Sequence, residues 1–327
     1  MKFTQLLGGM TFAVAAATLA SPAAAQSYPT RPVTIVVPFA PGGPTDIVAR
    51  SVAQAMEKSL GGTVGVENKP GAGGTVAVAD VARAPADGYR LLVHHIGMST
   101  APALYRKLPF DPLKDFEYIG LINAVPMTLL VRPGLPVNSV KELTAYVKAN
   151  RDKVTLANAG LGAASHLCGL LFQQAIATNL TTVPYKGTAP AMADLLGGQV
   201  DILCDQTTQT TPQILSGKLR ALAITSPRRI DTLKDVPTAA EAGLPGFELS
   251  VWHGMYAPKN TPKPVVDKIV ASMQAALKDP DLVKRFNDLG SVMEAPDRQT
   301  PDALAKYLKS EIDKWAPIIK NAGEYAD

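Results

Sequence analysis

The chain has 327 residues, of which 46% are hydrophobic, and its 32 Lys and Arg against 28 Asp and Glu give a formal net charge of +4. This length predicts one large or two medium-sized domains, with ample apolar material for a packed core. The basic residues are scattered, which argues against a nucleic-acid-binding surface, and no segment after residue 25 is long and apolar enough to span a membrane.

Residues 1–25 have the organisation of a secretory signal peptide. Lys2 precedes an apolar stretch at 11–20, and the small residues at 21–25 provide a cleavage site before Gln26. A membrane anchor is the alternative interpretation, but the apolar stretch is short for a span. We therefore expect a secreted mature chain that begins at residue 26.

The first part of the mature chain alternates strands with helices. A continuous apolar run at 33–39 is typical of a parallel strand covered on both faces. It is followed by a predicted helix at 47–60, a strand at 63–67, a helix at 76–84 and a strand at 89–94. This βαβαβ order predicts an α/β sheet with crossover helices.

The segment 116–131 is strand-rich and predicts two strands, at 118–122 and 127–131. The alternation then restarts with helices at 140–149, 165–177 and 189–196 and strands at 154–158, 181–184, 200–204 and 219–225. A strand at 249–257 and helices at 264–278, 280–289 and 301–322 complete the chain. Two α/β lobes joined by strands predict a ligand cleft between them. We assign residues 26–126 and 251–327 to the first lobe and 127–250 to the second.

Three glycine-rich turns, within residues 33–46, 64–75 and 154–162, each end a predicted strand and precede a helix. The unpaired N–H groups of a helix start carry roughly half a positive charge, which suits a carboxylate. One such turn is most simply a tight helix cap, but three of them in both lobes predict an anion receptor. The first-lobe candidates for ligand contact are Phe39, Ala40, Pro41, Gly42, Gly43, Thr45, Asp46, Gly73, Gly74 and Thr75.

Polar side chains at other strand ends extend this candidate site. His94 and His95 end a strand, and alternation allows only one of them to face the cleft; His95 is the candidate, with Ser99 beyond it. His166 is equally well explained as a satisfied helix histidine. Asp46 suits the helix dipole and is also placed to orient a water or a ligand amine. The second-lobe candidates are Asn158, Ala159, Gly160, Ser165, His166, Tyr185, Thr188, Asp205 and Gln206.

Cys168 and Cys204 are the two cysteines of the chain. In a secreted protein an even count favours a disulfide, and two buried free thiols are the alternative.

Catalytic and cofactor motifs are missing from the sequence. It has no G-x-S-x-G elbow, no P-loop, no H-E-x-x-H and no C-x-x-C, and Val76 stands where a dinucleotide fingerprint needs its third glycine. A metal site from His94, His95 and Asp205 has no support from ligand spacing. We therefore expect no enzymatic activity, no metal and no cofactor, and a monomer.

Six segments resemble one known family. They are residues 28–33 (YPTRPV), 38–46 (PFAPGGPTD), 67–74 (ENKPGAGG), 183–187 (VPYKG), 194–201 (DLLGGQVD) and 235–246 (DVPTAAEAGLPG). The pattern is similar to that of the Bug receptors, the periplasmic solute-binding proteins of tripartite tricarboxylate transporters. It covers essentially the whole mature chain.

This resemblance implies a two-lobed α/β periplasmic-binding-protein fold of the Venus flytrap type (type II), without enzymatic activity, in the periplasm. It also implies an organic carboxylate as ligand and membrane permease subunits as partners. In the family, one carboxylate lies between the first two glycine loops, here 40–46 and 71–75, often through waters. The distal end of the ligand meets the second lobe, here 158–166, 185–188 and 205–208.

The sequence departs from the family pattern around Asp205, which follows Cys204 and precedes the polar run 206–211. These hydroxyls and amides suit a second carboxylate, and Tyr185 and His166 are placed to flank a ring. We therefore favour an aromatic or other dicarboxylate. A sensing co-receptor for a membrane signalling partner and a secreted enzyme that uses the same cleft remain the alternatives.

Overall fold

The computed structural model describes residues 28–323 and 325–326, so the predicted signal peptide lies outside the described residues. Its early elements are β1 (Val33–Val37), α1 (Pro44–Leu60), β2 (Val64–Asn68), η1 (Ala72–Gly74), α2 (Thr75–Ala82), β3 (Arg90–His95), α3 (Gly97–Leu104) and β4 (Phe116–Val131). The middle of the chain forms α4 (Val140–Asn150), β5 (Thr155–Asn158), α5 (Ala164–Ala175), β6 (Thr181–Pro184), α6 (Thr188–Leu196), β7 (Ile202–Gln206), α7 (Thr207–Leu215), β8 (Arg220–Ile224) and η2 (Asp231–Leu233). The last elements are β9 (Ser250–Pro258), α8 (Lys263–Ala276), α9 (Pro280–Asp288), β10 (Val292–Met293) and α10 (Pro301–Ala322).

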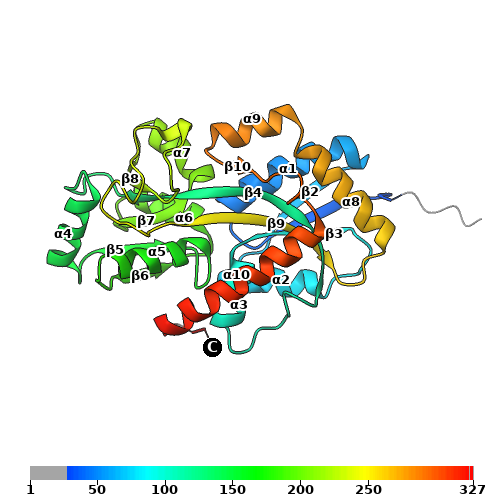
Figure 1. Ribbon diagram of the computed structural model, residues 1–327, viewed down its shortest axis with the longest axis horizontal. Helices are drawn as coiled ribbons and strands as arrows, with labels where there is room; N and C mark the ends of the chain where they lie inside the picture. Colours follow the sequence, from blue (N-terminus) through cyan, green and yellow to red (C-terminus); the bar gives the residue numbers. More distant parts are fainter. Residues whose placement is uncertain (1–27, 324, 327) are drawn as a thin grey trace, which may run out of the picture.

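The strands form one continuous sheet in the order β2-β1-β3-β9-β4-β7-β5-β6, and β8 and β10 also pair with β4. The pairs β1–β2, β1–β3, β5–β6 and β5–β7 are parallel, whereas β4 and β9 are antiparallel to their neighbours. Figure 1 shows β4 and β9 running side by side through the middle, with one group of helices and parallel strands at each end.

The segment 116–131 was predicted to form two strands, and this prediction is wrong. β4 is a single strand of 16 residues. Residues 116–126 pair with β9, and residues 127–131 pair with β7 and β8. Pairing along its whole length keeps the segment extended through Asn123 and Pro126, where its apolar pattern is interrupted.

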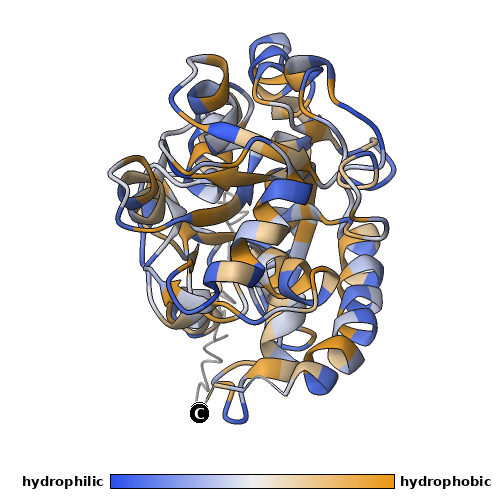
Figure 2. Ribbon diagram, turned by 90° about the vertical axis from the view of Figure 1, so that its left-hand side faces the viewer, coloured by the Kyte–Doolittle hydropathy of each residue, from blue (hydrophilic) through white to orange (hydrophobic). Residues whose placement is uncertain are grey.

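Helix α1 shows how local sequence sets the first half of the sheet. Pro44 opens the helix, and Gly61 ends it in the left-handed conformation with φ 77°. Val48, Val52 and Met56 are fully buried on one face, against β1 and α8. In Figure 2 the hydrophobic colour gathers on the central strands, and hydrophilic colour marks outer helix faces and loops. No helix among the described residues is long and apolar enough to cross a membrane.

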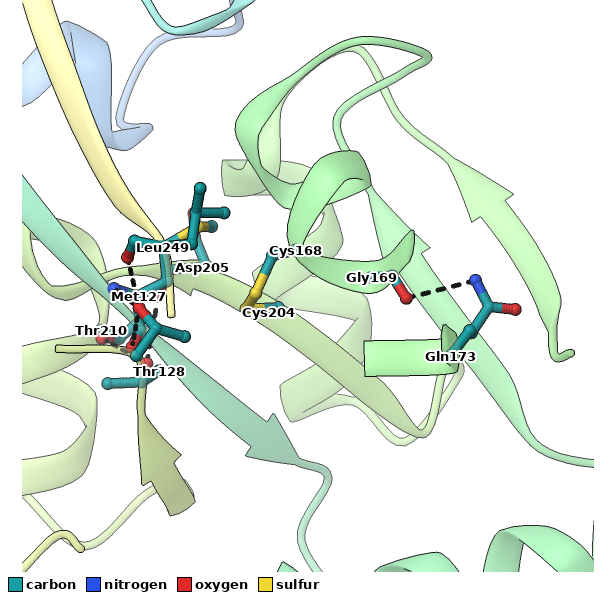
Figure 3. The surroundings of a disulfide bond; sticks show 10 residues. Met127, Thr128, Cys168, Gly169, Gln173, Cys204, Asp205, Thr210 and Leu249 are labelled. Atoms are coloured by element: carbon teal, nitrogen blue, oxygen red, sulfur yellow. Dashed lines mark hydrogen bonds between the residues drawn. A yellow bond between two sulfur atoms is a disulfide. The ribbon is translucent and has the colours of Figure 1, made fainter. Parts of the chain in front are cut away.

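Thr225 joins the two places where the chain crosses between the halves of the sheet. Its Oγ1 accepts a hydrogen bond from the Met127 N–H at 2.8 Å and donates one to the Leu249 carbonyl at 2.6 Å. Its backbone N–H also donates to the Met127 carbonyl. Figure 3 shows Met127 and Leu249 next to each other, near the disulfide. The buried hydroxyl of Thr225 thus ties the end of the first crossing to the start of the second.

We expect Thr225→Val to lower the free energy of unfolding by about 1–3 kcal/mol, because it leaves two buried backbone groups without this partner. Urea denaturation measures the change. Thr144→Val is the matched control, since Thr144 is half-buried and bonds only locally, to the Val140 carbonyl; it should change stability by no more than about 0.5 kcal/mol. Equal losses in the two variants would show that Thr225 has no special part in joining the crossings.

Candidate functional site

The first glycine turn lies against the second half of the molecule, which is the end of the sheet formed by β5–β8 with the helices α4–α7; the end formed by β1–β3 is the first half. Gly42 has φ 80°, a conformation that suits glycine, and Gly43 precedes α1. The Ala40 N–H donates to the Lys186 carbonyl at 3.0 Å. A Cβ on Gly43 would lie 3.8 Å from Thr188 Oγ1. The start of α1 therefore faces the start of α6 across the gap between the two halves.

The second glycine turn makes the same kind of contact. Gly71, Gly73 and Gly74 all have positive φ. The hydroxyl of Tyr105 donates to the Ala72 carbonyl at 2.7 Å and lies 3.3 Å from the Leu161 carbonyl, in the third glycine turn. With the backbone bond from Ala40 to Lys186, this bridge shows that the structure has the two halves closed on each other.

The third glycine turn is held by its own side chains. Asn158 Oδ1 accepts from the Gly160 N–H, and Ser165 Oγ accepts from the Ala159 N–H, both at 2.8 Å. His166 Nδ1 accepts from the Gly162 N–H at 3.3 Å. These bonds fix the path of the turn, and the residues at the start of α5 line a cavity shared with the first half.

In the described part of the chain, an inner and an outer cavity lie between the halves. The inner cavity is lined by Phe39, Pro44, Thr45, His95, Ala159, Ala163, Ala164, Ser165, Thr188, Asp205 and Gln206. Its volume is only about 10 Å³. This is room for about one water molecule. The outer cavity, of about 670 Å³, is lined by Phe39, Gly71, Ala72, Gly73, Gly74, Tyr105, Ala159, Gly160, Leu161, Pro184, Tyr185, Lys186, Pro190 and Ala326.

Four helices begin at the inner cavity: α1 and, from the other half, α5, α6 and α7. Their N-cap residues are Gly43, Ala163, Gly187 and Gln206, and none of the four makes a side-chain capping hydrogen bond. Of the helices that begin elsewhere, α4, α9 and α10 are capped by Ser139, Asp279 and Thr300, whereas α2, α3 and α8 also lack a side-chain cap. The inner cavity is therefore distinguished by the convergence of four helix starts. Uncapped helix starts present N–H donors and partial positive charge, so the inner cavity suits an anion.

The inner cavity contains a buried carboxyl group and no basic side chain of Lys or Arg among its lining residues. Asp205 is 1% exposed, and burial raises the pKa of its carboxyl to about 8. Hydrogen bonding to the Gln206 N–H and the Thr188 hydroxyl acts in the opposite direction and lowers this pKa, but burial is the larger cause. Asp205 Oδ2, Gln206 Oε1 and the neighbouring Thr208 Oγ1 are buried without a hydrogen-bond partner.

Three buried histidines stand behind the first-half wall of this cavity. His95 stacks on Phe39 with ring centroids 4.7 Å apart, and burial lowers its pKa to about 3. Burial also lowers the pKa of His94 and of His253, the latter lying 3.3 Å from Thr45 Oγ1 and 2.8 Å from Asn123 Oδ1. All three are neutral at physiological pH and supply hydrogen-bonding atoms rather than charge.

The structure brings many of the candidate residues together. Those at the inner cavity are Phe39, Thr45, His95, Ala159, Ser165, Thr188, Asp205 and Gln206. Those at the outer cavity are Phe39, Gly73, Gly74, Ala159, Gly160 and Tyr185. The remaining candidates line neither cavity: Ala40, Pro41, Gly42, Gly43, Asp46, Thr75, Ser99, Asn158 and His166.

Several of those remaining side chains are engaged in the structure itself. The Asp46 carboxylate accepts from the Gly42 N–H, Arg50 Nε and Asn68 Nδ2 at 2.8–3.0 Å, so it braces the first glycine turn. Ser99 Oγ donates to the Ile96 carbonyl within α3. At the outer cavity, the Tyr185 hydroxyl donates to Asp194.

Some lining residues were not named individually among the candidates. Ala163 and Ala164, at the start of α5, line the inner cavity, and Leu161 lines the outer one; all three lie within the segment 158–166 that was expected to meet the ligand. Tyr105, which lines the outer cavity, lies outside every segment predicted for the site. No local pattern distinguishes these residues from other alanines, leucines and tyrosines of the chain. His253 was missed because its link to Thr45 spans 208 positions.

A disulfide joins Cys168, in α5, to Cys204, in β7. Asp205 follows Cys204 directly, and Ser165 lies one turn before Cys168. The bridge therefore holds together two elements that line the inner cavity (Figure 3).

Comparisons with known proteins agree on one family. Residues 48–324 match the family model described as tripartite tricarboxylate transporter family receptor. The structure of the periplasmic binding protein BugD is 55% identical, with a TM-score of 0.90 over 92% of this chain and 100% of that one. MatC from Rhodopseudomonas palustris, solved with bound malate, is 41% identical, with a TM-score of 0.86 over 89% of this chain and 100% of that one. An R. palustris protein solved with adipate is 34% identical, with a TM-score of 0.85 over 90% of this chain and 98% of that one.

These similarities confirm the expected periplasmic-binding-protein fold and the Bug-type resemblance. The related proteins are named as binding proteins and receptors, not as enzymes. The chain therefore belongs to the tripartite tricarboxylate transporter receptor family, and it is a solute-binding receptor of the Bug type.

Proposed function

We propose that this receptor captures a small organic dicarboxylate between its two lobes in the periplasm, as a monomer, and delivers it to the membrane permease subunits of a tripartite tricarboxylate transporter. The observation that carries the proposal is the convergence of four uncapped helix starts, from both lobes, on one cavity. Their N–H groups can neutralise an anion without Lys or Arg, directly or through bridging waters.

The arrangement gives each end of a dicarboxylate its own donors. In the first lobe the donors are the start of α1 and Thr45. In the second lobe they are the starts of α5, α6 and α7, with Ser165; the Thr188 hydroxyl instead donates to Gln209 Oε1 at 2.8 Å. Such a ligand would bridge the lobes, and closure would bury it, which is the hinge mechanism of two-lobed receptors.

We favour short aliphatic diacids over aromatic ones; the inner cavity has room for about one water molecule in this closed structure, so either ligand requires the lobes to separate slightly more. His166, expected to flank a ring, lines neither cavity, and the Tyr185 hydroxyl is bonded to Asp194. Malate and adipate, seen in the two related structures, are both aliphatic. Aromatic diacids belong in the same screen, because Phe39 lines both cavities and offers a ring face.

We expect a thermal-shift screen of the ligand-stripped protein to single out dicarboxylates. Ligand at 100 times its dissociation constant should stabilise the folded protein by about 2.7 kcal/mol, which raises Tm by several degrees. The panel contains malate, succinate, adipate, phthalate and terephthalate, with the matching monocarboxylates as controls. If no carboxylate raises Tm, the proposed ligand class is wrong; if a hit is chemically converted, the receptor is also an enzyme.

A further inference from the structure

Asp205 is the one acidic side chain that lines the inner cavity. It is the fourth residue of the buried strand β7, and it pairs with Thr128 of β4. The side chain is almost completely buried, and its Oδ2 atom has no hydrogen-bond partner. A site suited to anions thus contains a carboxyl group with one unused oxygen.

No cation compensates this carboxyl from the elements packed around it. From α5 the nearby titratable group is His166, which is bonded to the Gly162 N–H. From β3 the nearby titratable group is His95, and His94 and His253 lie behind His95. Burial lowers the pKa of all three histidines and keeps them neutral.

The remaining neighbouring elements place no Lys or Arg side chain at the inner cavity. Lys186, in the loop before α6, is exposed and lines the outer cavity only. Near the start of α1 the charged residues are Asp46 and Arg50, which bind each other. In α6 the charged residue is Asp194, which accepts a hydrogen bond from the Tyr185 hydroxyl. The sequences of β5 and α7 contain no titratable residue. The titratable residues of β4 are Glu117 and Tyr118, which pair with β9 at the far end of the strand.

An ionised carboxylate in this position would be buried without a counter-charge, next to the negative charge of a bound ligand. Both effects favour the neutral acid. A neutral carboxyl gains an O–H donor, and an O–H···O⁻ hydrogen bond to a carboxylate is short and strong. Asp205 lines the cavity and its Oδ2 has no partner within the protein, so this oxygen is available for such a bond.

On the basis of the proposed function, we propose that Asp205 takes up one proton when the lobes close on a dicarboxylate, and that this proton makes a hydrogen bond to a ligand carboxylate. We expect water to reach Asp205 in the separated lobes, so that its carboxyl ionises as an ordinary aspartate does, with a pKa well below neutrality. In the closed state its pKa is raised, to about 8 without ligand. Capture is therefore favoured at lower pH and release at higher pH.

The direction of the pH effect follows from this difference. Between the two pKa values the closed complex binds one proton more than the open receptor, so the dissociation constant should rise about tenfold per pH unit. Above the pKa of Asp205 in the complex neither state holds the proton, and the dissociation constant should level off.

Isothermal titration calorimetry with malate and with adipate tests the inference. At about pH 7, titrations in buffers of different ionisation enthalpy should show uptake of close to one proton per ligand. Asp205→Asn keeps an N–H donor but cannot titrate. It should take up no proton on binding, and its dissociation constant should not change with pH. Asp194→Asn, a half-buried acid that lines neither cavity, is the control and should behave as the wild type does.

The outcomes separate this inference from the proposed function. Binding by the wild type without proton uptake would show that Asp205 is ionised in the complex. Loss of binding in Asp205→Asn by more than a hundredfold would show that the carboxylate itself, paired with a ligand cation, is needed. Either result overturns the inference but leaves the receptor function standing. If no carboxylate of the screening panel binds the wild type, both fall together.

Discussion

Gly73→Ala is expected to raise the dissociation constant for ligand by at least about a hundredfold while both lobes stay folded. A Cβ at this position would lie 2.0 Å from the Leu161 carbonyl oxygen and 2.8 Å from the Tyr105 hydroxyl. Leu161 belongs to the opposite lobe, and a backbone oxygen cannot turn away. The methyl group therefore obstructs closure. A hundredfold lower closed population raises the apparent dissociation constant by the same factor.

Gly61→Ala is the matched control for backbone strain. Gly61 has φ +77° against +61° for Gly73, but a Cβ there meets nothing within 4 Å. Both variants should lose about 1–2 kcal/mol of stability from the left-handed conformation. Of the two variants, only Gly73→Ala should bind the ligand more weakly, as measured by calorimetry. Only this variant should also remain open in the presence of ligand, as measured by small-angle scattering. Wild-type affinity in Gly73→Ala would mean that the ligand-bound receptor does not close as this structure does.

Replacing the disulfide by Cys168→Ala with Cys204→Ala is expected to lower the free energy of unfolding by about 3–4 kcal/mol. The bridge closes a loop of 36 residues, and in the chain-entropy model it stabilises mainly by restricting the unfolded chain. Tm should fall by several degrees. Both cysteines are fully buried, so the native packing should survive in the variant.

Denaturation of the oxidised wild type, the reduced wild type and the double variant measures this effect. The reduced wild type and the double variant should share a lower midpoint, and malate affinity should change less than tenfold, because no sulfur atom lines either cavity. A double variant as stable as the oxidised protein would show that the bridge adds nothing beyond the packing of α5 on β7. A large loss of affinity would instead assign it a part in shaping the site.

The helix α7 shows why local pattern fails at part of the site. Its sequence begins with Thr207, Thr208, Gln209, Thr210 and Thr211, a run of mostly weak helix formers that gave no helix prediction. In the structure, hydroxyls of this run bond to partners distant in sequence. Thr207 donates to the Gly290 carbonyl, and Thr211 to the Leu289 carbonyl. These tertiary bonds supply what propensity lacks, and they place an uncapped helix start at the inner cavity.

By itself, the sequence determined the alternation of strands and helices, the glycine turns that need positive φ, and the candidacy of Asp205 as a polar residue at a strand end. These features depend on neighbours in the chain. Only the tertiary structure decided that β4 crosses both lobes as one strand and that four helix starts share one cavity. It also decided that Asp46 braces a turn and that Asp205 keeps an unused oxygen. The physical reason is that burial and hydrogen-bond satisfaction depend on residues far apart in the chain, which local periodicity cannot detect.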